Sequence, residues 1–119
     1  MANDFQTQAV QLGTGFLPLV PGINTASTNQ TVHAIYFSNI TTSSVDVYLT
    51  LYNNAATPVI LSGGYILYKV PVPASSTLVI EKPINLVCSG TAASSRALYA
   101  KASVGSAIDA VASVLVMTA

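Results

Sequence analysis

Charge is scarce in this sequence. Only 7% of its 119 residues are Asp, Glu, Lys or Arg, four acidic and four basic, and the formal net charge is zero. A nucleic-acid-binding protein needs clustered Lys and Arg to neutralise phosphates, and no such cluster is present. Disorder requires high charge and low hydrophobicity, whereas 51% of these residues are hydrophobic. Both classes are therefore excluded, and the length fits a single domain.

Cysteine and histidine are also nearly absent. Cys88 alone can form neither an internal disulfide framework nor a cysteine-based zinc site. The only histidine, His33, has no nucleophile motif and no second ligand at metal-binding spacing. We interpret it as a hydrogen-bonded or interfacial residue. No catalytic residue, cofactor site or metal site is predicted, and a small hydrolase is a remote alternative.

No segment resembles a targeting signal or a membrane span. The apolar run Phe16–Val20 contains a proline and is too short to cross a bilayer, and no basic residue precedes Lys69. We therefore expect a protein made in the cytosol, with no membrane and no nucleic acid among its partners.

Uncharged polar residues must cover much of the surface, since Ser, Thr, Asn and Gln make up 36 of the 119 residues. Such a surface is hydrated but only weakly repulsive, and zero net charge favours association. The composition therefore predicts a homo-oligomer or a component of a larger assembly. The alternative is a neutral monomer kept soluble by its hydroxyl and amide groups.

Period-two hydrophobicity begins at about residue 31 and predicts half-buried strands. Val45–Tyr52 is the clearest case, with Val45, Val47 and Leu49 on one face and tyrosines on the other. Ser62-Gly63-Gly64 is expected to turn the chain between two strands. Further strands are expected at Thr31–Asn39, Pro58–Leu61, Tyr65–Val72, Ser76–Glu81, Ile84–Cys88, Ala97–Val104 and Ser106–Met117.

About eight short strands separated by turns predict an all-β fold, an antiparallel β-sandwich of jelly-roll-like type. The alanine-rich segment from Ala93 to Ala119 could alternatively form a helix. Gly105 and the β-branched residues Val111, Val114 and Val116 favour strands there.

Residues 1–30 are expected to form an extended N-terminal arm with a short strand near Gln8–Leu12, followed by the sandwich domain at 31–119. Pro18 and Pro21 favour extended backbone and cannot donate to a central sheet ladder. The apolar residues of this arm could pack on the domain's own flank or on a neighbouring subunit. They are Phe16, Leu17, Leu19 and Val20.

Six tyrosines and no tryptophan are present. Tyr48 and Tyr52 share one strand face with Asp46, and exposed tyrosine suits protein interfaces because the ring buries area while the hydroxyl keeps a hydrogen bond. We predict an interface there. A simple cover for the sheet is the second interpretation, and a sugar platform is the third.

Four segments together resemble the small all-β virion proteins of tailed bacteriophages. The resemblance spans residues 31–117. Its segments are Ala34-Ile-Tyr-Phe-Ser-Asn39, Val45-Asp-Val-Tyr-Leu-Thr-Leu51, Val70-Pro-Val-Pro-Ala-Ser-Ser-Thr-Leu78 and the last strand, Val111–Val116.

The resemblance implies a non-enzymatic structural protein located in the virion and assembled in the host bacterial cytoplasm. Such proteins serve as capsid decoration (cement) proteins that pack between neighbouring shell subunits, or as neck, tail, baseplate or fibre-attachment components. The expected partners are the major capsid protein or tail and neck proteins. A homo-oligomer is expected, with a trimer favoured. A receptor- or sugar-binding module on the same fold is the rival hypothesis.

Overall fold

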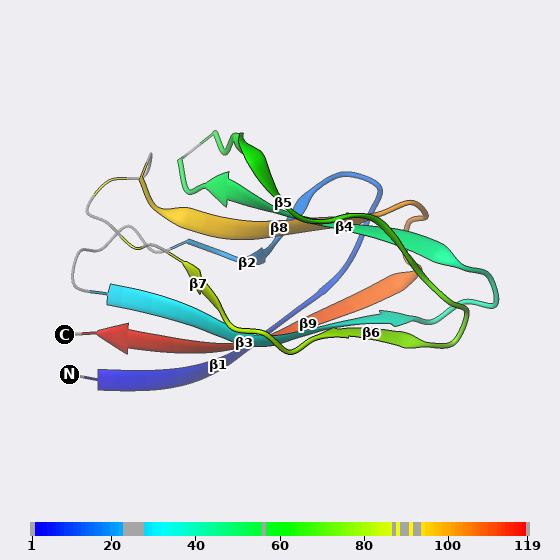
Figure 1. Ribbon diagram of the computed structural model, residues 1–119, viewed down its shortest axis with the longest axis horizontal. Helices are drawn as coiled ribbons and strands as arrows, with labels where there is room; N and C mark the ends of the chain where they lie inside the picture. Colours follow the sequence, from blue (N-terminus) through cyan, green and yellow to red (C-terminus); the bar gives the residue numbers. More distant parts are fainter. Residues whose placement is uncertain are drawn as a thin grey trace.

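The structure is a computed structural model that describes residues 2–22, 28–55, 57–86, 88, 91 and 94–118. In these residues nine strands form two antiparallel sheets that pack face to face (Figure 1). The predicted fold class, an all-β antiparallel sandwich, is confirmed. The strands are β1 (Ala2–Gln11), β2 (Leu17–Val20), β3 (Thr28–Asn39), β4 (Val45–Asn53), β5 (Ile60–Val72), β6 (Thr77–Ile80), β7 (Ile84–Leu86), β8 (Arg96–Ala102) and β9 (Ile108–Thr118).

Neighbouring strands in each sheet come from distant parts of the chain. Sheet A has the order β1-β9-β3-β6, with β7 also paired to β3, and sheet B has the order β2-β8-β4-β5. One apolar core fills the space between the sheets, and Phe37, Leu49 and Ile108 are among its fully buried members. Sheet A therefore has β1 at one edge and β6 with β7 at the other.

The first 22 residues differ from the expected extended arm. Residues 2–11 form β1, which pairs with β9 along its full length, and the chain then crosses to sheet B and forms β2. Leu19 and Val20 are 2% and 1% exposed and belong to the core. Pro18 is accommodated because β2 is an edge strand, where a missing N–H donor leaves no ladder bond unmade.

β4 follows the predicted alternation closely. Val45, Val47 and Leu49 are buried at 2% or less, and the tyrosines of this strand point to the outer face of sheet B. Cross-strand pairing with β8 begins at Val47, opposite Ala102, and continues to Asn53. The strict period of two is maintained because no bulge interrupts the β4–β8 ladder.

β5 does not follow the prediction of two strands separated by a turn. It is one strand, and its register against β4 shifts at three places. The segment Leu61–Gly64 lies opposite the single residue Leu51, so the predicted turn residues form a bulge inside the strand. The left-handed backbone of Gly63 (φ 76°) and Lys69 (φ 53°) marks two of these irregular positions.

The bulges give β5 an inward side chain at every third position. Leu61, Leu67 and Val70 are half-buried, while Tyr65 and Tyr68 are exposed. In a regular strand, residues three apart would point to opposite faces. Both tyrosines reach the outer face because the register shifts by one residue between them.

A bulge also changes which side chains of β3 face the core. Unbroken alternation along the predicted strand would place Ile35 and Phe37 on the same face as His33. The register against β9 shifts between Val32 and Ala34, so Val32, Ile35 and Phe37 are buried together and His33 is exposed. The extra residue at His33 reverses the alternation for the rest of the strand.

The C-terminal segment forms strands and no helix within the residues described, as the β-branched residues indicated. Most of its described alanines face the other sheet and lie in the core. Small side chains there allow close approach of the two sheets. The segment 89–95, which separates two of the predicted strands, falls largely outside the described residues. The alanines of the core are Ala100, Ala102, Ala107, Ala110 and Ala112, whereas Ala97 is buried on the outer face of sheet B, opposite Tyr52.

Candidate functional site: an aromatic surface on sheet B

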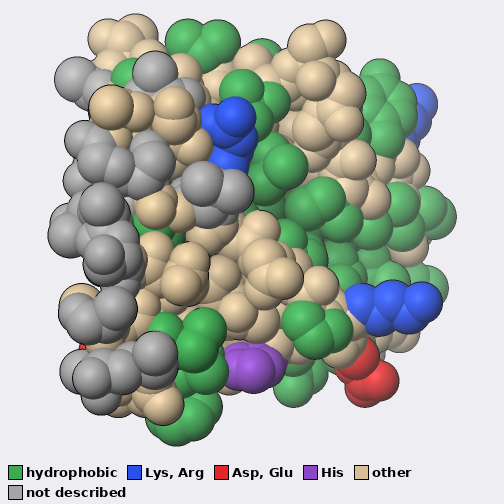
Figure 2. Space-filling model, turned by 60° about the vertical axis from the view of Figure 1, so that its left-hand side comes forward, with side chains coloured by type: hydrophobic (Ala, Val, Ile, Leu, Met, Phe, Trp, Pro, Cys, Tyr) green, Lys and Arg blue, Asp and Glu red, His purple; other side chains and the backbone are tan. Residues whose placement is uncertain are grey.

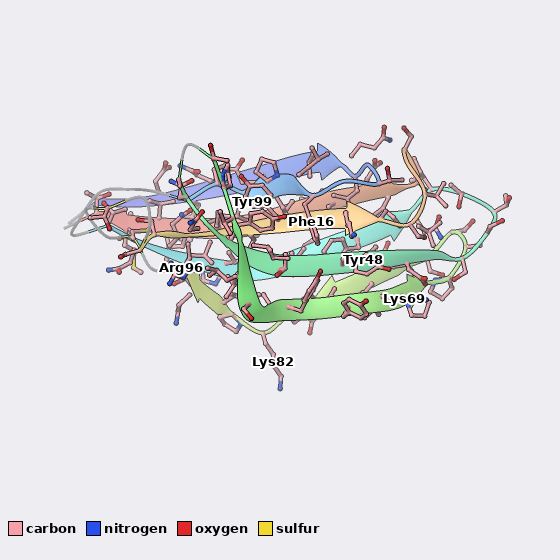
Figure 3. All side chains as sticks on the ribbon, turned by 90° about the horizontal axis from the view of Figure 1, so that it is seen from above. Phe16, Tyr48, Lys69, Lys82, Arg96 and Tyr99 are labelled. Carbon is pink, nitrogen blue, oxygen red and sulfur yellow. The ribbon has the colours of Figure 1, made fainter. Side chains whose placement is uncertain are left out.

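The largest group of aromatic side chains lies on the outer face of sheet B. Alternation along β4 and β8 places Tyr48, Tyr52, Tyr99 and Lys101 there, and the loop before β2 lays Phe16 over the same face (Figure 3). The bulged strand β5 supplies two more tyrosines. We call this set the aromatic surface, and its members are Phe16, Tyr48, Tyr52, Tyr65, Tyr68, Tyr99 and Lys101.

The rings contact one another in a continuous series. Tyr52 and Tyr99 stack with centroids 4.0 Å apart and an interplanar angle of 15°. The Phe16 ring lies 5.6 Å from Tyr52, tilted by 58°. Tyr65 and Tyr68 meet edge to face at 5.0 Å. The tilted and edge-to-face contacts have the geometry that the quadrupoles of aromatic rings favour.

The charged member of the aromatic surface, Lys101, contacts two of its rings. The Nζ atom of Lys101 lies 4.8 Å from the centroid of Phe16 and 4.6 Å from the centroid of Tyr48. Both distances are within the range of a cation–π interaction. Lys101 and Tyr48 are also direct cross-strand partners in the β8–β4 register. The ammonium group is therefore held between these two rings of the aromatic surface.

The rings completely cover one residue of the sheet. Thr50 lies on the outer face between Tyr99 of β8 and Tyr65 of β5, its cross-strand partners, and it is 0% exposed. Its Oγ1 atom has no hydrogen-bond partner among the described residues. The packing of the aromatic surface is thus close enough to exclude water from the sheet beneath it.

The pKa of Tyr52 is raised above its usual value of 10.0. Burial of its hydroxyl among the other rings is the main cause, and the nearby phenol groups of Tyr65 and Tyr99 add to it. Tyr52 is therefore a neutral phenol that can donate and accept hydrogen bonds throughout the physiological pH range.

Of the six residues predicted for an interface, the structure brings three together. Phe16 and Tyr52 are in contact, and Lys101 links Phe16 to Tyr48. Leu17, next in sequence to Phe16, is 38% exposed. The remaining two, Leu19 and Val20, are buried in the domain's own core, as described above. The segment is thus divided between the surface and the interior.

Sequence reasoning did not select four members of the aromatic surface. Tyr99 and Lys101 could have been found from the alternation Tyr99-Ala-Lys101, which matches the alternation of Tyr48 and Tyr52 on β4. Tyr65 and Tyr68 could not be assigned to this face by a period of two, because the β5 bulge between them has no recognisable sequence signal.

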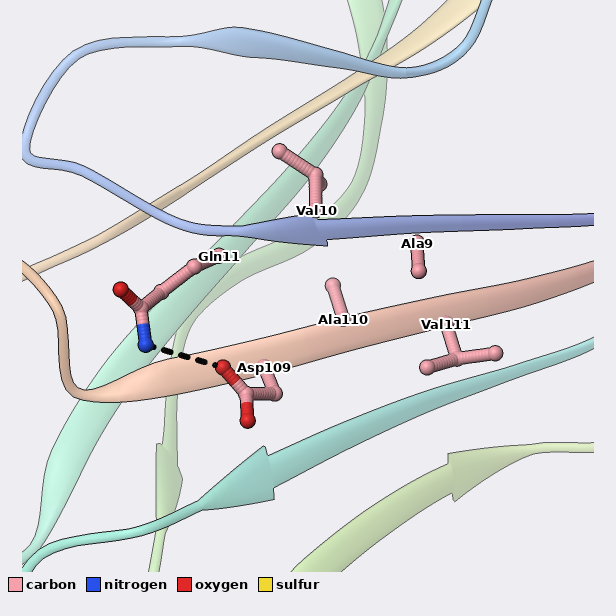
Figure 4. A pocket seen from close by; sticks show the side chains of 6 residues that line it. All are labelled: Ala9, Val10, Gln11, Asp109, Ala110 and Val111. Carbon is pink, nitrogen blue, oxygen red and sulfur yellow. Dashed lines mark hydrogen bonds between the residues drawn. The ribbon is translucent and has the colours of Figure 1, made fainter.

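Chemistry-bearing residues elsewhere are dispersed. A shallow hollow of about 290 Å³ lies at the end of β1 and the start of β9. Gln11 Nε2 donates to Asp109 Oδ1 there at 3.1 Å (Figure 4). His33 is an exposed residue of β3 in sheet A. In the described part of the chain no three His, Cys, Asp or Glu side chains gather as a metal site would require. No helix among these residues is long and apolar enough to span a membrane.

An apolar groove follows one open side of the sandwich. It has a volume of about 660 Å³ and lies between β5 and the β6–β7 segment, with Ile66, Leu78 and Val79 among its lining residues. Glu81 and Lys82 stand at its rim. Figure 2 shows how few charged side chains interrupt the hydrophobic and uncharged polar ones on one face of the molecule.

The fold is shared with three solved structures of low sequence identity. A chain described as "Bacillus endospore appendages form a novel family of disulfide-linked pili" matches with a TM-score of 0.53 and 9% identity, covering 98% of this chain and 87% of that one. No protein-family model matches the sequence, and a search of curated proteins finds no relative.

The other two structures are viral. One is described as the crystal structure of the T13 IBDV viral particle, with a TM-score of 0.54 and 12% identity over 96% of this chain and 30% of that one. The other, infectious bursal disease virus Gx strain, has a TM-score of 0.53 and 13% identity over 98% and 33%. This chain thus spans about a third of the viral chains. At these identities the similarity establishes the fold.

Proposed function

We propose that the chain is a structural subunit of a virus particle, and specifically a decoration (cement) protein of a tailed bacteriophage that packs between neighbouring subunits of the capsid. It acts there without catalysis, by burying its own surface against other virion proteins. A tail, neck or fibre-attachment position is the alternative location within the same particle.

The observation that carries this proposal is the aromatic surface. Six rings and one lysine form a packed, nearly uncharged face on a sheet, whereas an enzyme would need a cleft with converging titratable groups. Tyrosine is enriched at protein interfaces because its ring buries a large area and its hydroxyl keeps a hydrogen bond. Tyr68, which is 65% exposed, and Tyr65, at 42%, are the members most available to a partner.

The fold is consistent with this role. Chains from a viral particle, from infectious bursal disease virus and from disulfide-linked pili have a similar fold. A stable protein–protein contact buries about 800 Å² on each partner. The described chain exposes 6035 Å² in total, so one sheet face provides enough area for such a contact.

Neighbouring copies of the chain are expected to contact one another in the particle, and a trimer remains the expectation from the sequence. A disulfide-linked polymer, as in the pilus description, is not favoured for this chain. Linking each subunit covalently to two neighbours requires at least two cysteines, and the sequence contains Cys88 alone. Disulfides alone therefore could not link this chain into an extended polymer.

A sugar-binding module is the second candidate function. The stacked pair Tyr52 and Tyr99 and the exposed ring of Tyr68 could bind the apolar face of a sugar ring, with phenol hydroxyls to hydrogen-bond its substituents. The same surface thus serves either hypothesis, and the experiment has to separate protein from glycan partners.

The test begins with particles purified from cells that carry the gene. Mass spectrometry should detect the chain at a fixed copy number per particle, and immunogold labelling in negative stain should place it on the shell. Absence of the chain from purified particles would contradict the proposal. Label confined to the tail would select the alternative location.

Two matched variants identify the contact surface. Tyr68→Ser, in the aromatic surface, should reduce incorporation into particles about tenfold or more, the loss expected for an interface anchor. Val104→Ser, at a 50% exposed site in the turn between β8 and β9, should leave it unchanged. A glycan array probed with the same two variants completes the test. Hits that Tyr68→Ser removes, with normal particle incorporation, would favour the sugar-binding module.

A further inference from the structure

The two sheets have four edges, and three of them are interrupted. β2 contains Pro18 and a register shift. β5 contains three register shifts and Pro71. On the far edge of sheet A, β6 and β7 are short strands separated by a segment that ends at Pro83. Proline, bulges and short strands are the means by which proteins prevent edge-to-edge pairing.

β1 has none of these protections. It is a ten-residue strand without proline, glycine or bulge, and it pairs in continuous register with β9 from Ala2 to Gln11. Asp4 is its only charged residue. Among the described residues no strand pairs with its other side. A long regular edge of this kind is a template for a further strand.

The backbone groups that face outward can be identified. Leu12 N donates to Ile108 O at 2.9 Å, and Leu12 O accepts from Ser106 N at 3.1 Å, so the even-numbered residue at this end directs its backbone toward β9. Antiparallel ladders alternate strictly, and the β1–β9 register has no shift. The odd-numbered residues of β1 therefore direct their N–H and C=O groups away from the sheet. These are Asn3, Phe5, Thr7, Ala9 and Gln11.

We propose that β1 pairs antiparallel with β1 of a second copy of this chain around a two-fold axis at Gln6, which joins two A sheets into one. In this register Phe5 lies opposite the partner copy's Thr7, and Asp4 lies opposite its Gln8. About eight backbone hydrogen bonds form, two for each of the four pairs of odd-numbered residues. The contact uses a sheet edge and leaves the aromatic surface free.

The side chains of β1 favour this partner and this register. Gln6 Nε2 donates to Asp4 Oδ2 at 2.9 Å, and Gln8 Nε2 donates to Gln6 Oε1 at 3.1 Å. In the paired arrangement the Gln8 amide of one copy can also donate to the Asp4 carboxylate of the other copy. Each Asp4 carboxylate therefore has an amide donor in both copies. Moving the axis to Thr7 would place Asp4 opposite Val10, an apolar side chain. Moving it to Phe5 would lose two of the hydrogen bonds.

Phe5 provides a second reason for a partner at this edge. It is 77% exposed, more than any other large hydrophobic side chain described. On the outer face of sheet A it lies beside Leu115, its cross-strand neighbour in β9. In the paired arrangement the partner copy's Thr7 lies on its other side. The ring then packs between two strands.

The first test is sedimentation velocity of the purified chain over a range of concentrations. The wild type should form a dimer. Thr7→Pro removes an outward N–H and should weaken the dimer about tenfold or more without unfolding the domain. Gln8→Pro is the matched control, because it removes an inward N–H that β9 uses and should lower the melting temperature. A monomeric wild type, or a dimer unaffected by Thr7→Pro, would overturn the proposal.

The second test reads the register directly. At a two-fold axis the facing Cα atoms of Gln6 would be about 4.5–5.5 Å apart, a distance that a disulfide can bridge. In a Cys88→Ser background, Gln6→Cys should give a covalent dimer on mild oxidation. Gln8→Cys should not, because the two copies of that residue would lie four residues apart along the ladder. Crosslinking of Gln8→Cys with none for Gln6→Cys would contradict the register.

The third test uses charge and does not perturb the backbone. Gln8→Asp places a carboxylate opposite Asp4 of the other copy and should weaken the dimer at low salt, whereas Gln8→Lys should strengthen it. Equal dimer affinities for the two variants would contradict the proposed register, in which residue 8 lies opposite Asp4 of the other copy. Tyr68→Ser separates this contact from the one proposed for the virion. It should leave the β1 dimer intact even where it abolishes incorporation into particles.

Discussion

Tyr52 and Tyr99 stack at 4.0 Å although they are diagonal rather than direct cross-strand neighbours. In the β4–β8 register Tyr52 lies opposite Ala97, and Tyr99 lies opposite Thr50. Because the two rings meet along the diagonal, Thr50 lies beneath them. The small side chain of Ala97 leaves space for the Tyr99 ring beside Tyr52. The aromatic surface is therefore a product of the register, since a shift of one residue would separate these rings.

This stacking should be measurable as a coupling free energy. Tyr52→Leu and Tyr99→Leu each keep apolar area but remove the ring contact. In a double-mutant cycle on the free energy of unfolding, we expect the pair to interact by about 0.5–1.5 kcal/mol. Tyr36→Leu, on the outer face of the opposite sheet, supplies the control, and its effect should add to that of Tyr52→Leu. Additivity of the stacked pair as well would disprove the coupling.

Replacement of Thr50 by valine should stabilise the domain. Thr50→Val keeps the β-branched shape and removes a buried hydroxyl that has no partner among the described residues, so we expect a gain of about 1 kcal/mol. Ser95→Ala is the comparison, because Ser95 Oγ donates to Thr91 O at 2.9 Å and its loss should cost about 1 kcal/mol. Urea denaturation measures both. A Thr50→Val variant less stable than the wild type would contradict the expectation.

Asn39 should be the most sensitive polar residue of the interior. Its Nδ2 donates to Ser43 O at 2.8 Å and to Val72 O at 2.9 Å, and its Oδ1 accepts from Thr41 N and Oγ1. Asn39 thus ties the end of β3 to β5 in the other sheet. Asn39→Ala removes all four of these hydrogen bonds, although Ser43 O still accepts from Thr41 Oγ1 at 3.0 Å.

We expect Asn39→Ala to lower the free energy of unfolding by about 2–3 kcal/mol. Asn29→Ala, at an exposed position of the same strand, should change it by less than about 0.5 kcal/mol. Thermal or urea denaturation of the two variants provides the comparison. Equal effects would mean that the hydrogen bonds of Asn39 do not contribute to stability.

The raised pKa of Tyr52 predicts an alkaline loss of stability. The unfolded chain ionises this phenol near pH 10, while the folded chain holds it neutral to a higher pH. Above pH 10 the unfolded state therefore binds fewer protons, and stability falls as pH rises, whereas below pH 10 this group contributes no pH dependence. Tyr52→Phe should flatten the stability profile above pH 10. An unchanged slope would show that other groups cause the loss.

The sequence predicted most reliably the parts of the chain where alternation is unbroken. β4 and the β-sandwich class followed from the period of two, and the choice of strands over helix in the last segment followed from Val111, Val114 and Val116. In each case the local pattern and the tertiary packing favour the same result.

Where bulges occur, the pattern was read incorrectly. Ser62-Gly63-Gly64 has the composition of a turn, but neighbouring β4 holds these residues within one strand. In β3, where alternation placed Val32 and Ile35 on opposite faces, one extra residue near His33 brings both to the core. Bulges depend on the pairing partner as well as on local propensity, so a single sequence does not locate them.

In β5 every third side chain points inward, so substitutions and deletions in this strand have different consequences. Substitutions at Tyr65, Ile66 or Tyr68 would keep the backbone path, even where, as at Tyr68, they remove a contact with a partner. Deletion of one residue between the two tyrosines would instead turn one ring into the core and bring an aliphatic side chain to the surface. In evolution this strand should therefore tolerate point mutation far more readily than insertion or deletion.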